Sequence, residues 1–398
     1  MNRTIIRLSL LLLFFLFGCS QDSQDEMEYK DGMDRGIVEQ INRLSLEEKM
    51  GQMLMVGVNG YFMDNSTKQM ITDYHVGGFV ILGSNVRDEL ELRKLIETLK
   101  ETNKTNNHPL LLAIDEEGGR ITRFPENVSK LPSNQKVGQL NNQDLSYKIG
   151  GLLAEKVAYF GFNMNFAPVL DVNSNPRNRV IGDRSFSSNP QVVSKLGIKT
   201  MQGIRDNGVI PVIKHFPGHG DTFVDSHLGL PTLPHDQERL RSIELHPFAN
   251  AIKEKADVVM TAHILLPKLD ASNPATISKA VITELLRKEL GFEGVVITDD
   301  LTMGAIAKHH TVGEAAVKSV LAGSDILLIA HHHPKAKEAI EALGKAVADG
   351  EISEKRINES VYRILALKKK YKLDENQNQS STLEEINQKI DEVVRKYF

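Results

Sequence analysis

The 398-residue sequence holds a single cysteine and no large excess of either charge. Because Cys19 stands alone, it has no disulfide partner within the chain. The formal net charge of −4 implies no basic face, so we expect no nucleic-acid partner and no strong attraction to an anionic membrane surface. Hydrophobic residues at 41% and charged residues at 25% are ordinary for a soluble globular protein with a sizeable core.

The apolar run at the N-terminus is short for a membrane-spanning helix, which needs about 20 apolar residues. Arg3 and Arg7 precede this run, which extends from Leu8 to Phe17, and together they have the architecture of a secretory signal. The segment ends in LFGC, residues 16–19, which resembles a bacterial lipobox. This resemblance implies cleavage before Cys19 and a lipid on its thiol. A cleaved signal with an incidental cysteine and an uncleaved anchor stay open as alternatives.

Residues 20–36 are polar and acidic, which indicates a flexible tether between the lipid and the folded domain. We therefore divide the N-terminal region into a lipoprotein signal peptide, 1–19, and a tether, 20–36. The expected location is extracytoplasmic, with the protein anchored by its lipid to the bacterial cell membrane.

Eight short apolar runs alternate with helical patterns from residue 37 onward. Several runs are apolar throughout, as is typical of parallel strands buried on both faces. The runs are residues 52–58, 77–83, 109–117, 162–172, 209–216, 256–264, 294–300 and 324–330. Stretches between them carry apolar residues at spacings of three and four, which predicts helices at residues 67–76, 86–103 and 235–255, among others.

Eight strand–helix repeats predict a (β/α)8 barrel of the TIM type, an α/β fold, as a single catalytic domain over residues 37–372. Its last part, 336–372, contains two closing helices. A doubly wound open sheet is the alternative, but no Gly-rich dinucleotide-binding or P-loop sequence follows the first strand. Residues 373–398 are predicted to form a polar linker and one amphipathic C-terminal helix.

Polar side chains follow five of the predicted strands, at the end where barrel enzymes keep their active sites. A single Asp there is often only a helix cap, but five such strand ends together favour a functional site, because charged groups are costly to desolvate. The groups are Asp115-Glu116-Glu117 with Arg120 and Arg123; Asp171 with Arg177, Arg179, Asp183 and Arg184; residues 214–231; Thr261-Ala262-His263; and Thr298-Asp299-Asp300.

Residues 214–231, KHFPGHGDTFVDSHLGLP, contain three histidines and two aspartates. On a helix, His215 and His219 would suit zinc. Pro217 and the flanking glycines instead predict a turn, which would not hold both imidazoles on one face. We therefore expect no metal and no other cofactor, although coordination by a loop stays open as an alternative. His219 and Asp221 are interpreted as loop-shaping residues, and the histidines of HHHP, 331–334, are left unassigned.

The same segment contains Asp225-Ser226-His227, a pattern suited to proton transfer. An aspartate two residues from a histidine can orient the imidazole and stabilise its protonated form, so that it acts as general acid and then as general base. The nucleophile must come from elsewhere, and Asp299-Asp300 is the candidate. A Ser/His/Asp triad through Ser226 is disfavoured because no Gly-x-Ser-x-Gly sequence surrounds it.

Six motifs together resemble the β-N-acetylglucosaminidase branch of glycoside hydrolase family 3, over roughly residues 37 to 345 and in the family's order. They are AIDEEGGRITRF, FAPVLDV, VIGDRSFSSNP, KHFPGHGDTFVDSHLGLP, TAHILLP and VVITDDLTMGAI. The resemblance implies a (β/α)8 barrel. Many members carry a second α/β domain, which we do not expect here, and its lack favours the branch with a self-contained Asp–His pair.

The resemblance also implies roles for individual residues. Asp299 would be the nucleophile that forms a glycosyl-enzyme intermediate. His227 would protonate the departing sugar oxygen and then activate water, and Asp225 would hold and tune His227. The residues implied to line the sugar pocket are Asp115, Arg123, Arg184, Lys214 and His215.

The implied substrates are N-acetylglucosamine-containing saccharides. Outside the membrane, peptidoglycan is the nearby source of β-1,4-linked N-acetylglucosamine, so we expect exo-hydrolysis of muropeptides in cell-wall turnover, by a monomer; this step depends on location and analogy. A metal-dependent barrel hydrolase and a lipid-anchored sugar-binding protein without turnover stay as rival hypotheses, and phosphorolysis stays open beside hydrolysis.

Overall fold

A parallel sheet of eight strands, in the order β10-β1-β2-β3-β4-β5-β6-β9, forms the centre of the molecule. The computed structural model describes residues 27–28, 30, 32–223, 226, 229–375 and 381–398. The strands of this sheet are β1 (Leu54–Gly57), β2 (Gly78–Ile81), β3 (Leu111–Ile114), β4 (Met164–Asn165), β5 (Ile210–Phe216), β6 (Val258–Thr261), β9 (Val295–Thr298) and β10 (Leu327–Ile329).

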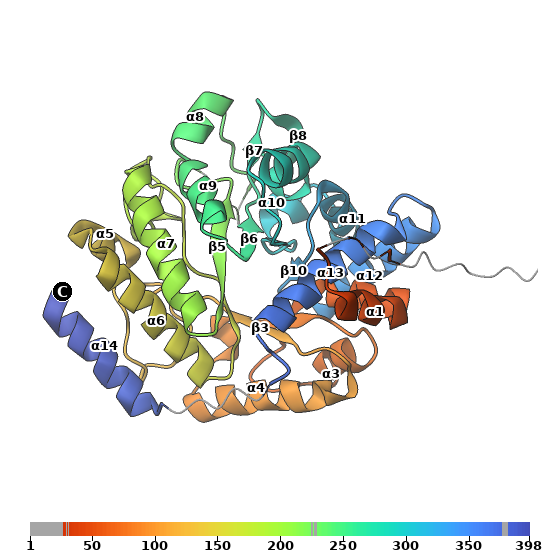
Figure 1. Cartoon of the computed structure of the whole chain (residues 1–398), viewed down its shortest axis with the longest axis horizontal. Coiled ribbons are helices and arrows are strands. Elements are labelled where there is room, and N and C mark those ends of the chain that lie inside the picture. Colours follow the sequence, from red (N-terminus) through yellow and green to blue (C-terminus); the bar gives the residue numbers. More distant parts are fainter. Residues whose placement is uncertain (1–26, 29, 31, 224–225, 227–228, 376–380) are drawn as a thin grey trace, which may run out of the picture.

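The sheet closes on itself. Ile297 in β9 pairs in parallel with Ile326, directly before β10, and the N–H of Thr298 donates to the carbonyl of Ile326 at 3.0 Å. The ring arrangement with helices outside it is visible in Figure 1. The predicted (β/α)8 barrel is therefore confirmed, and the doubly wound alternative is wrong, because an open sheet would keep two unpaired edges.

Each of the eight predicted runs contains one barrel strand, and every strand residue is buried. Side chains pointing inward fill the barrel, while those pointing outward pack beneath the helices, so both faces exclude water. This is why the runs are apolar throughout instead of alternating.

Helices surround the barrel and account for most of the remaining chain. The α-helices are α1 (Arg35–Arg43), α2 (Leu46–Gln52), α3 (Asn65–Thr72), α4 (Glu89–Thr102), α5 (Asn134–Leu140), α6 (Gln143–Tyr159), α7 (Pro190–Asp206), α8 (Gln237–Ser242), α9 (His246–Lys253), α10 (Gly304–Ala307), α11 (Val312–Ala322), α12 (His333–Ala348), α13 (Glu354–Lys370) and α14 (Leu383–Tyr397). The structure also contains short 3₁₀ helices and one π-helix. The 3₁₀ helices are η1 (Gly83–Asn85), η2 (Asn103–Thr105), η3 (Gly182–Arg184) and η4 (Ala275–Ile277), and the π-helix is η5 (Ala280–Glu289).

Two features differ from the expectation. The stretch 235–255 forms two helices, α8 and α9, because Pro247 occupies the first turn of α9 and cannot continue the hydrogen bonds of a preceding helix. An antiparallel pair, β7 (Leu265–Leu266) and β8 (Asp270–Pro274), follows β6. The sequence of β8, DASNP, is polar and lacks any strand pattern.

The C-terminal helix α14 packs against α6. Its apolar residues Ile386, Ile390 and Val393 are buried, and Lys389 forms an ion pair of 2.7 Å with Glu155 of α6. The spacing of these three residues places them on one face of the helix, as the amphipathic pattern predicts.

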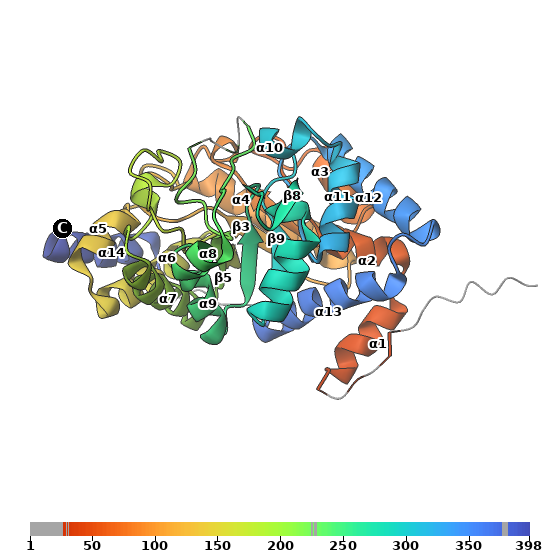
Figure 2. The same ribbon diagram turned by 90° about the horizontal axis from the view of Figure 1, so that it is seen from above.

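The loops after β4 and β5 lie on the same side of the barrel as α10 (Figure 2). They leave the carboxyl ends of neighbouring parallel strands, so the side chains that they carry converge there. Gly220 shows how closely the two loops approach, because a Cβ at this position would lie 1.8 Å from the carbonyl oxygen of Val172. The predicted turn at residues 217–220 is present, with the N–H of Gly218 donating to the carbonyl of His215.

Candidate active site

Lys214 joins two acidic side chains at the centre of the candidate site. It lies near the carboxyl end of β5, and its Nζ is 2.6 Å from Asp115 Oδ1 and 2.7 Å from Glu117 Oε1. The side chain of Lys214 is 2% exposed, whereas that of Asp115 is 20% exposed. Lys214 is therefore held by Glu117, whose side chain is 1% exposed, while Asp115 keeps access to a ligand.

Arg184 links Glu117 to two further groups. Its Nε and one terminal nitrogen donate to the two oxygens of Glu117 at 2.9 and 2.7 Å, which is the bidentate geometry that guanidinium and carboxylate groups favour. The same terminal nitrogen lies 3.3 Å from His215 Nε2, and His215 Nδ1 lies 2.7 Å from Asp171 Oδ2. These contacts bring Arg184, Lys214 and His215 together.

Burial alone would raise the pKa of Glu117, but the charges of Arg184 and Lys214 outweigh it and hold the pKa far below its usual range. In turn, burial opposes the charge of Arg184, and Glu117 more than compensates and raises the pKa of the guanidinium. Glu117 is therefore a permanent anion that fixes two cations. In the sequence it was one of several polar residues after a strand, and nothing distinguished it from Glu116.

Arg123 lies at the edge of this group with donors to spare. Its terminal nitrogen is 3.7 Å from Asp115 Oδ2, and its Nε is inaccessible and has no hydrogen-bond partner among the residues that the structure describes. The backbone N–H of Arg123 donates to Glu116, which is fully buried in an ion pair of 2.8 Å with Lys156. Glu116 thus holds the loop that presents Arg123.

Asp299 and Asp300, which follow β9, have separate tasks. Asp300 is saturated by the protein: its Oδ1 accepts the backbone N–H groups of Thr302 and Ala330 at 3.0 and 3.1 Å, and its Oδ2 accepts the Thr302 hydroxyl at 2.7 Å. Asp299 accepts one hydrogen bond from the described residues, from the backbone N–H of Asp300 at 2.8 Å, and is partly exposed. Of the two, Asp299 is the carboxylate available for chemistry.

The surroundings of Asp299 keep it ionised. Burial raises its pKa, but the imidazoles of His263 and His215, the backbone N–H of Asp300 and the ammonium of Lys214 together lower the pKa below its ordinary value. His263 comes from the end of β6 and is fixed between Thr276 Oγ1 and the carbonyl of Asp300. An ionised, partly exposed carboxylate meets the requirement for a nucleophile.

Asp225 and His227, the predicted proton-transfer pair, lie outside the described residues, as does Cys19. Ser226 between the pair is described and is 3% exposed. Its carbonyl accepts the backbone N–H of Ala305 in α10 at 3.0 Å. The peptide segment between Asp225 and His227 is therefore tied to the element that follows Asp299.

The remaining polar residues of the loop after β4 shape the rim. Arg120 forms an exposed ion pair of 2.6 Å with Asp183 and donates to the carbonyl of Arg179. Arg177 stacks on the ring of Phe223 at 4.7 Å, and Phe223 is 65% exposed. These residues connect the loops after β3, β4 and β5.

Asp221, His235 and Glu244 bring three potential ligand atoms within 4.8 Å of one another, which by distance alone could hold a metal ion. The guanidinium of Arg239 donates to Glu244 Oε1 at 3.0 Å and to Asp221 Oδ2 at 3.4 Å, and His235 Nε2 lies 2.7 Å from the same Asp221 oxygen. The charge of Arg239 already pairs with both carboxylates, so we interpret the group as a set of ion pairs that joins the loop after β5 to α8 and to the turn between α8 and α9.

The histidines at 331–333 divide into different environments. His333 is buried, with Nδ1 2.7 Å from Ser66 Oγ and Nε2 2.9 Å from the carbonyl of Gly57, so it is a structural residue. His331 is 55% exposed and lies 3.8 Å from Asp300 Oδ2.

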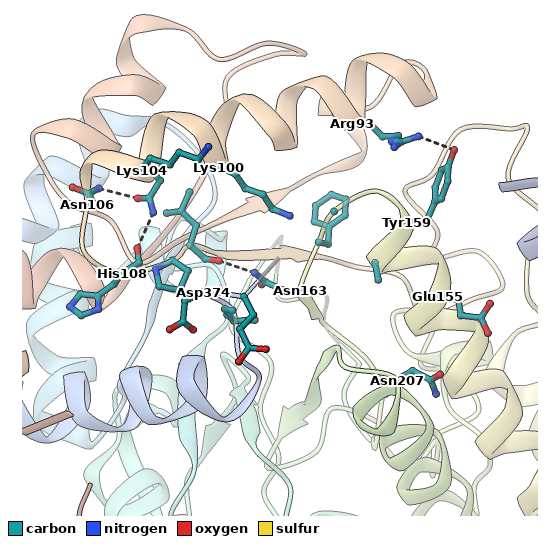
Figure 3. A pocket seen from close by; sticks show the side chains of 18 of the residues that line it. Arg93, Lys100, Lys104, Asn106, His108, Glu155, Tyr159, Asn163, Asn207 and Asp374 are labelled. Atoms are coloured by element: carbon teal, nitrogen blue, oxygen red, sulfur yellow. Dashed lines mark hydrogen bonds between the residues drawn. The ribbon is translucent and has the colours of Figure 1, made fainter. Parts of the chain in front are cut away.

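A cavity of about 950 Å³ lies at the opposite end of the barrel (Figure 3). Its wall includes Lys100, His108 and Asn163, and the amide of Asn163 donates to the carbonyl of Leu110 directly before β3. This cavity is at the amino ends of the strands and shares no residue with the candidate active site.

Within the described part of the chain, no helix is long and apolar enough to cross a membrane.

A closed (β/α)8 barrel that gathers an ionised carboxylate, imidazoles and fixed cations at the carboxyl ends of its strands is the architecture of a barrel enzyme. Residues 45–367 match the family model described as "Glycosyl hydrolase family 3 N terminal domain". The chain therefore belongs to glycosyl hydrolase family 3, as its motifs indicated, and is a glycoside hydrolase.

Individual relatives agree with this assignment. The chain is 34% identical to "Beta-hexosaminidase A" of Pseudoalteromonas piscicida, over 82% of this chain and 61% of that protein, so it spans less than two thirds of that relative's length. It is 34% identical to a "Beta-hexosaminidase" of Tolumonas auensis, over 84% of this chain and 99% of that protein. Its fold is similar to the structure of a family 3 β-N-acetylglucosaminidase from Paenibacillus sp. str. FPU-7, with a TM-score of 0.84 and 42% identity over 89% of this chain and 69% of that one.

Proposed function

We propose that this protein is a retaining exo-β-N-acetylglucosaminidase that releases terminal β-linked N-acetylglucosamine. The observation that carries the proposal is Asp299, an ionised and partly exposed carboxylate beside His215 and Lys214. The names of the matched relatives, β-hexosaminidase and β-N-acetylglucosaminidase, support this choice of substrate.

The reaction proceeds in two displacements. Asp299 attacks the anomeric carbon while the bond to the leaving oxygen breaks, and His227 gives its proton to that oxygen. The neutral His227 then takes a proton from water, the hydroxide attacks the anomeric carbon, and the bond to Asp299 breaks. Two inversions give net retention, and Asp225 stabilises the protonated form of His227.

The cluster around Lys214 binds the sugar. Asp115, Lys214 and His215 present an acceptor, a donor and an imidazole at the ends of β3 and β5, and Arg123 adds a guanidinium whose side chain is 31% exposed. Fixed polar partners discriminate strongly between sugars, because a ligand that lacks a matching hydroxyl leaves a buried group unpaired. Glu117 and Asp171 act behind this layer, by holding Arg184, Lys214 and His215 in place.

We further propose that the enzyme is an extracytoplasmic lipoprotein, anchored through Cys19, that acts as a monomer on muropeptides in cell-wall turnover. The signal-like residues 1–19 and the polar tether support the location. Metabolic labelling with a fatty-acid probe tests it: label in the wild type and none in Cys19→Ser supports the anchor, and equal label in both contradicts it. Release of N-acetylglucosamine from purified muropeptides tests the substrate.

Turnover of a chromogenic β-N-acetylglucosaminide by the wild type, Asp299→Ala and His227→Ala, each with and without excess chelator, tests the mechanism. We expect Asp299→Ala to be inactive and the chelator to have no effect. Asp391→Ala on α14 is the matched control, because it removes an exposed carboxylate far from the site. Ordinary activity of Asp299→Ala would contradict the proposal, loss on chelation would favour a metal-dependent hydrolase, and sugar binding without turnover by the wild type would favour a binding protein.

A further inference from the structure

The loop after β3, residues 115–133, carries Arg123 and two carboxylates of the candidate active site, and it extends from there to α5 on the outside of the barrel. Its inner part holds the site residues, and its outer part is 127–133. The N–H of Gly119 in the inner part donates to the carbonyl of Leu131 in the outer part at 2.9 Å. The two parts therefore form one hydrogen-bonded unit.

Lys156 of α6 provides a second connection between the two parts. Its Nζ donates to Glu116 Oε1 at 2.8 Å and to the carbonyl of Ser129 at 3.1 Å. The other carboxylate oxygen of Glu116 accepts the backbone N–H of Arg123 at 3.3 Å. One ion pair, with both side chains 0% exposed, thus lies between the backbone of Ser129 and the backbone of Arg123.

This ion pair depends on its additional hydrogen bonds. Taking two charges out of water is costly, and their attraction compensates for it only when the remaining donors and acceptors of both ions also find partners. The carbonyl of Ser129 is such a partner for Lys156, and the N–H of Arg123 is one for Glu116. The pair therefore favours one arrangement of both backbone segments.

The C-terminal helix α14 holds the outer part of the loop through the side chain of Asn387. Asn387 Oδ1 accepts the backbone N–H of Ser129 at 2.8 Å, and Asn387 Nδ2 donates to the carbonyl of Asn127 at 2.8 Å. Val128, between these two residues, is 2% exposed and belongs to the hydrophobic core. Because an amide side chain offers both an acceptor and donors, Asn387 holds the backbone on both sides of Val128.

The contacts of Asn387 are separate from those that attach α14 to the barrel. The helix lies beside α6 on the outside of the molecule (Figure 1). Three buried apolar residues and the ion pair of Lys389 with Glu155 attach it to α6. The helix α14 therefore has two kinds of contact, one with the outer ring and one with the loop that carries Arg123.

We propose that Asn387 is a positioning residue for sugar binding, which acts through the loop after β3 on the guanidinium of Arg123. The connection runs from the backbone at 127–129 through the ion pair of Lys156 and Glu116 to the backbone of Arg123. A loop that is fixed before the ligand arrives loses less conformational freedom on binding, so its affinity is higher. This inference rests on the proposed sugar contact of Arg123.

A double-mutant cycle between Asn387→Ala and Arg123→Ala tests the proposal. With Arg123 present, Asn387→Ala should raise KM for a chromogenic β-N-acetylglucosaminide and lower kcat/KM by about fivefold, the size of one net hydrogen bond, with kcat nearly unchanged. In the Arg123→Ala background, the same substitution should have no further effect, because the group through which it acts is missing. Equal losses in both backgrounds would overturn the positioning role.

Lys389→Ala is the matched control. It removes another polar contact of the same helix, but that contact joins α14 to α6 and not to the loop after β3. Its KM should stay at the wild-type value. A comparable rise in KM would show that general loosening of α14 causes the effect and would contradict the proposal. Thermal unfolding of each variant separates folding defects from changes in binding.

Hydrogen–deuterium exchange of the free enzyme gives a measurement that does not depend on turnover. Asn387→Ala should speed exchange in peptides that cover 116–131, including the amides of Ser129 and Arg123, whereas Lys389→Ala should not. Unchanged exchange at Arg123 in Asn387→Ala would mean that the connection does not reach the site, and the proposal would fail.

The single variant Arg123→Ala separates this inference from the proposed function. If it binds and turns over the substrate like the wild type, the proposed sugar contact of Arg123 fails, and the positioning role fails with it. If Arg123→Ala loses affinity while Asn387→Ala keeps the wild-type KM and the wild-type exchange, only the positioning role fails.

Discussion

The backbone N–H of Asp300 donates a hydrogen bond of 2.8 Å to the carboxylate of Asp299. The second aspartate of the pair thus supports the first through its backbone, while its own side chain binds the turn that follows and the end of β10. Two adjacent carboxylates of the same chemistry therefore have different functions.

The two variants Asp299→Asn and Asp300→Asn should lose different properties, the first its turnover and the second its stability. Asp299→Asn should fold with little change and lose turnover, because the amide does not form the glycosyl-enzyme bond. Asp300→Asn replaces one acceptor oxygen by a donor next to groups that also donate, and each buried donor left unsatisfied costs about 1–3 kcal/mol. Thermal unfolding together with single-turnover kinetics measures both effects; a stable but inactive Asp300→Asn would contradict this division.

Glu117→Gln should destabilise the protein more than any rim variant. The substitution leaves Arg184 and Lys214 buried without their shared anion, and removal of one partner from a buried ion pair costs about 3–5 kcal/mol. Asp183→Asn is the control, since its pair with Arg120 is exposed and such pairs contribute about 1 kcal/mol or less. Urea unfolding gives both values, and equal losses would show that Glu117 is not a buried anchor.

Low pH should reduce the free energy of unfolding of the wild type, in part because Glu117 becomes protonated. Its folded-state pKa is depressed below the ordinary value of 4.5, so its contribution to the free energy of unfolding is complete above that pH. The contribution is lost as pH falls from 4.5 toward the folded-state pKa. Between pH 6 and 3, the unfolding free energy of Glu117→Gln should therefore fall less steeply than that of the wild type. Parallel curves would show that Glu117 is not ionised in the folded protein.

Arg123→Ala should reduce sugar binding with little loss of stability. In this variant, Asp115 keeps its ion pair with Lys214, so the substitution leaves no buried charge without a partner. A charged hydrogen bond contributes about 1.5–3 kcal/mol, which corresponds to a loss of roughly 10- to 100-fold in kcat/KM. Arg120→Ala, which removes another arginine from the same rim, should change the kinetics little; identical behaviour of the two variants would argue against a sugar contact for Arg123.

Much of the fold was predictable because barrel strands are defined locally. A run such as 77–83 is apolar at every position, and only burial on both faces makes such a strand stable. Helix limits were less predictable: residues 235–255 keep a helical spacing of apolar residues, although Pro247 interrupts the hydrogen bonds. The pair β7–β8 had no strand pattern in the sequence, because DASNP is polar and is held by hydrogen bonds from the backbone of Ser272 and Asn273 to the Asp270 carboxylate.

The candidate site was predictable in its membership but not in its organisation. The position of a polar residue after a strand identifies it as a rim residue, and the motifs single out Asp115, Lys214, His215 and Asp299. The role of Glu117 depends on two cations: Arg184 in the loop after β4, which is 67 positions further along the chain, and Lys214 in β5, which is 97 positions further along. No local pattern encodes such a distance.

By itself, the sequence determined the alternation of strands and helices and the set of polar residues at the carboxyl ends, because these depend on spacing within short segments. Only the tertiary structure decided that Glu117 anchors two cations and that Asp300 supports the backbone while Asp299 stays available. The physical reason is that the charge state and hydrogen-bond capacity of a buried group are set by whichever neighbours the closed barrel brings within about 3 Å of it.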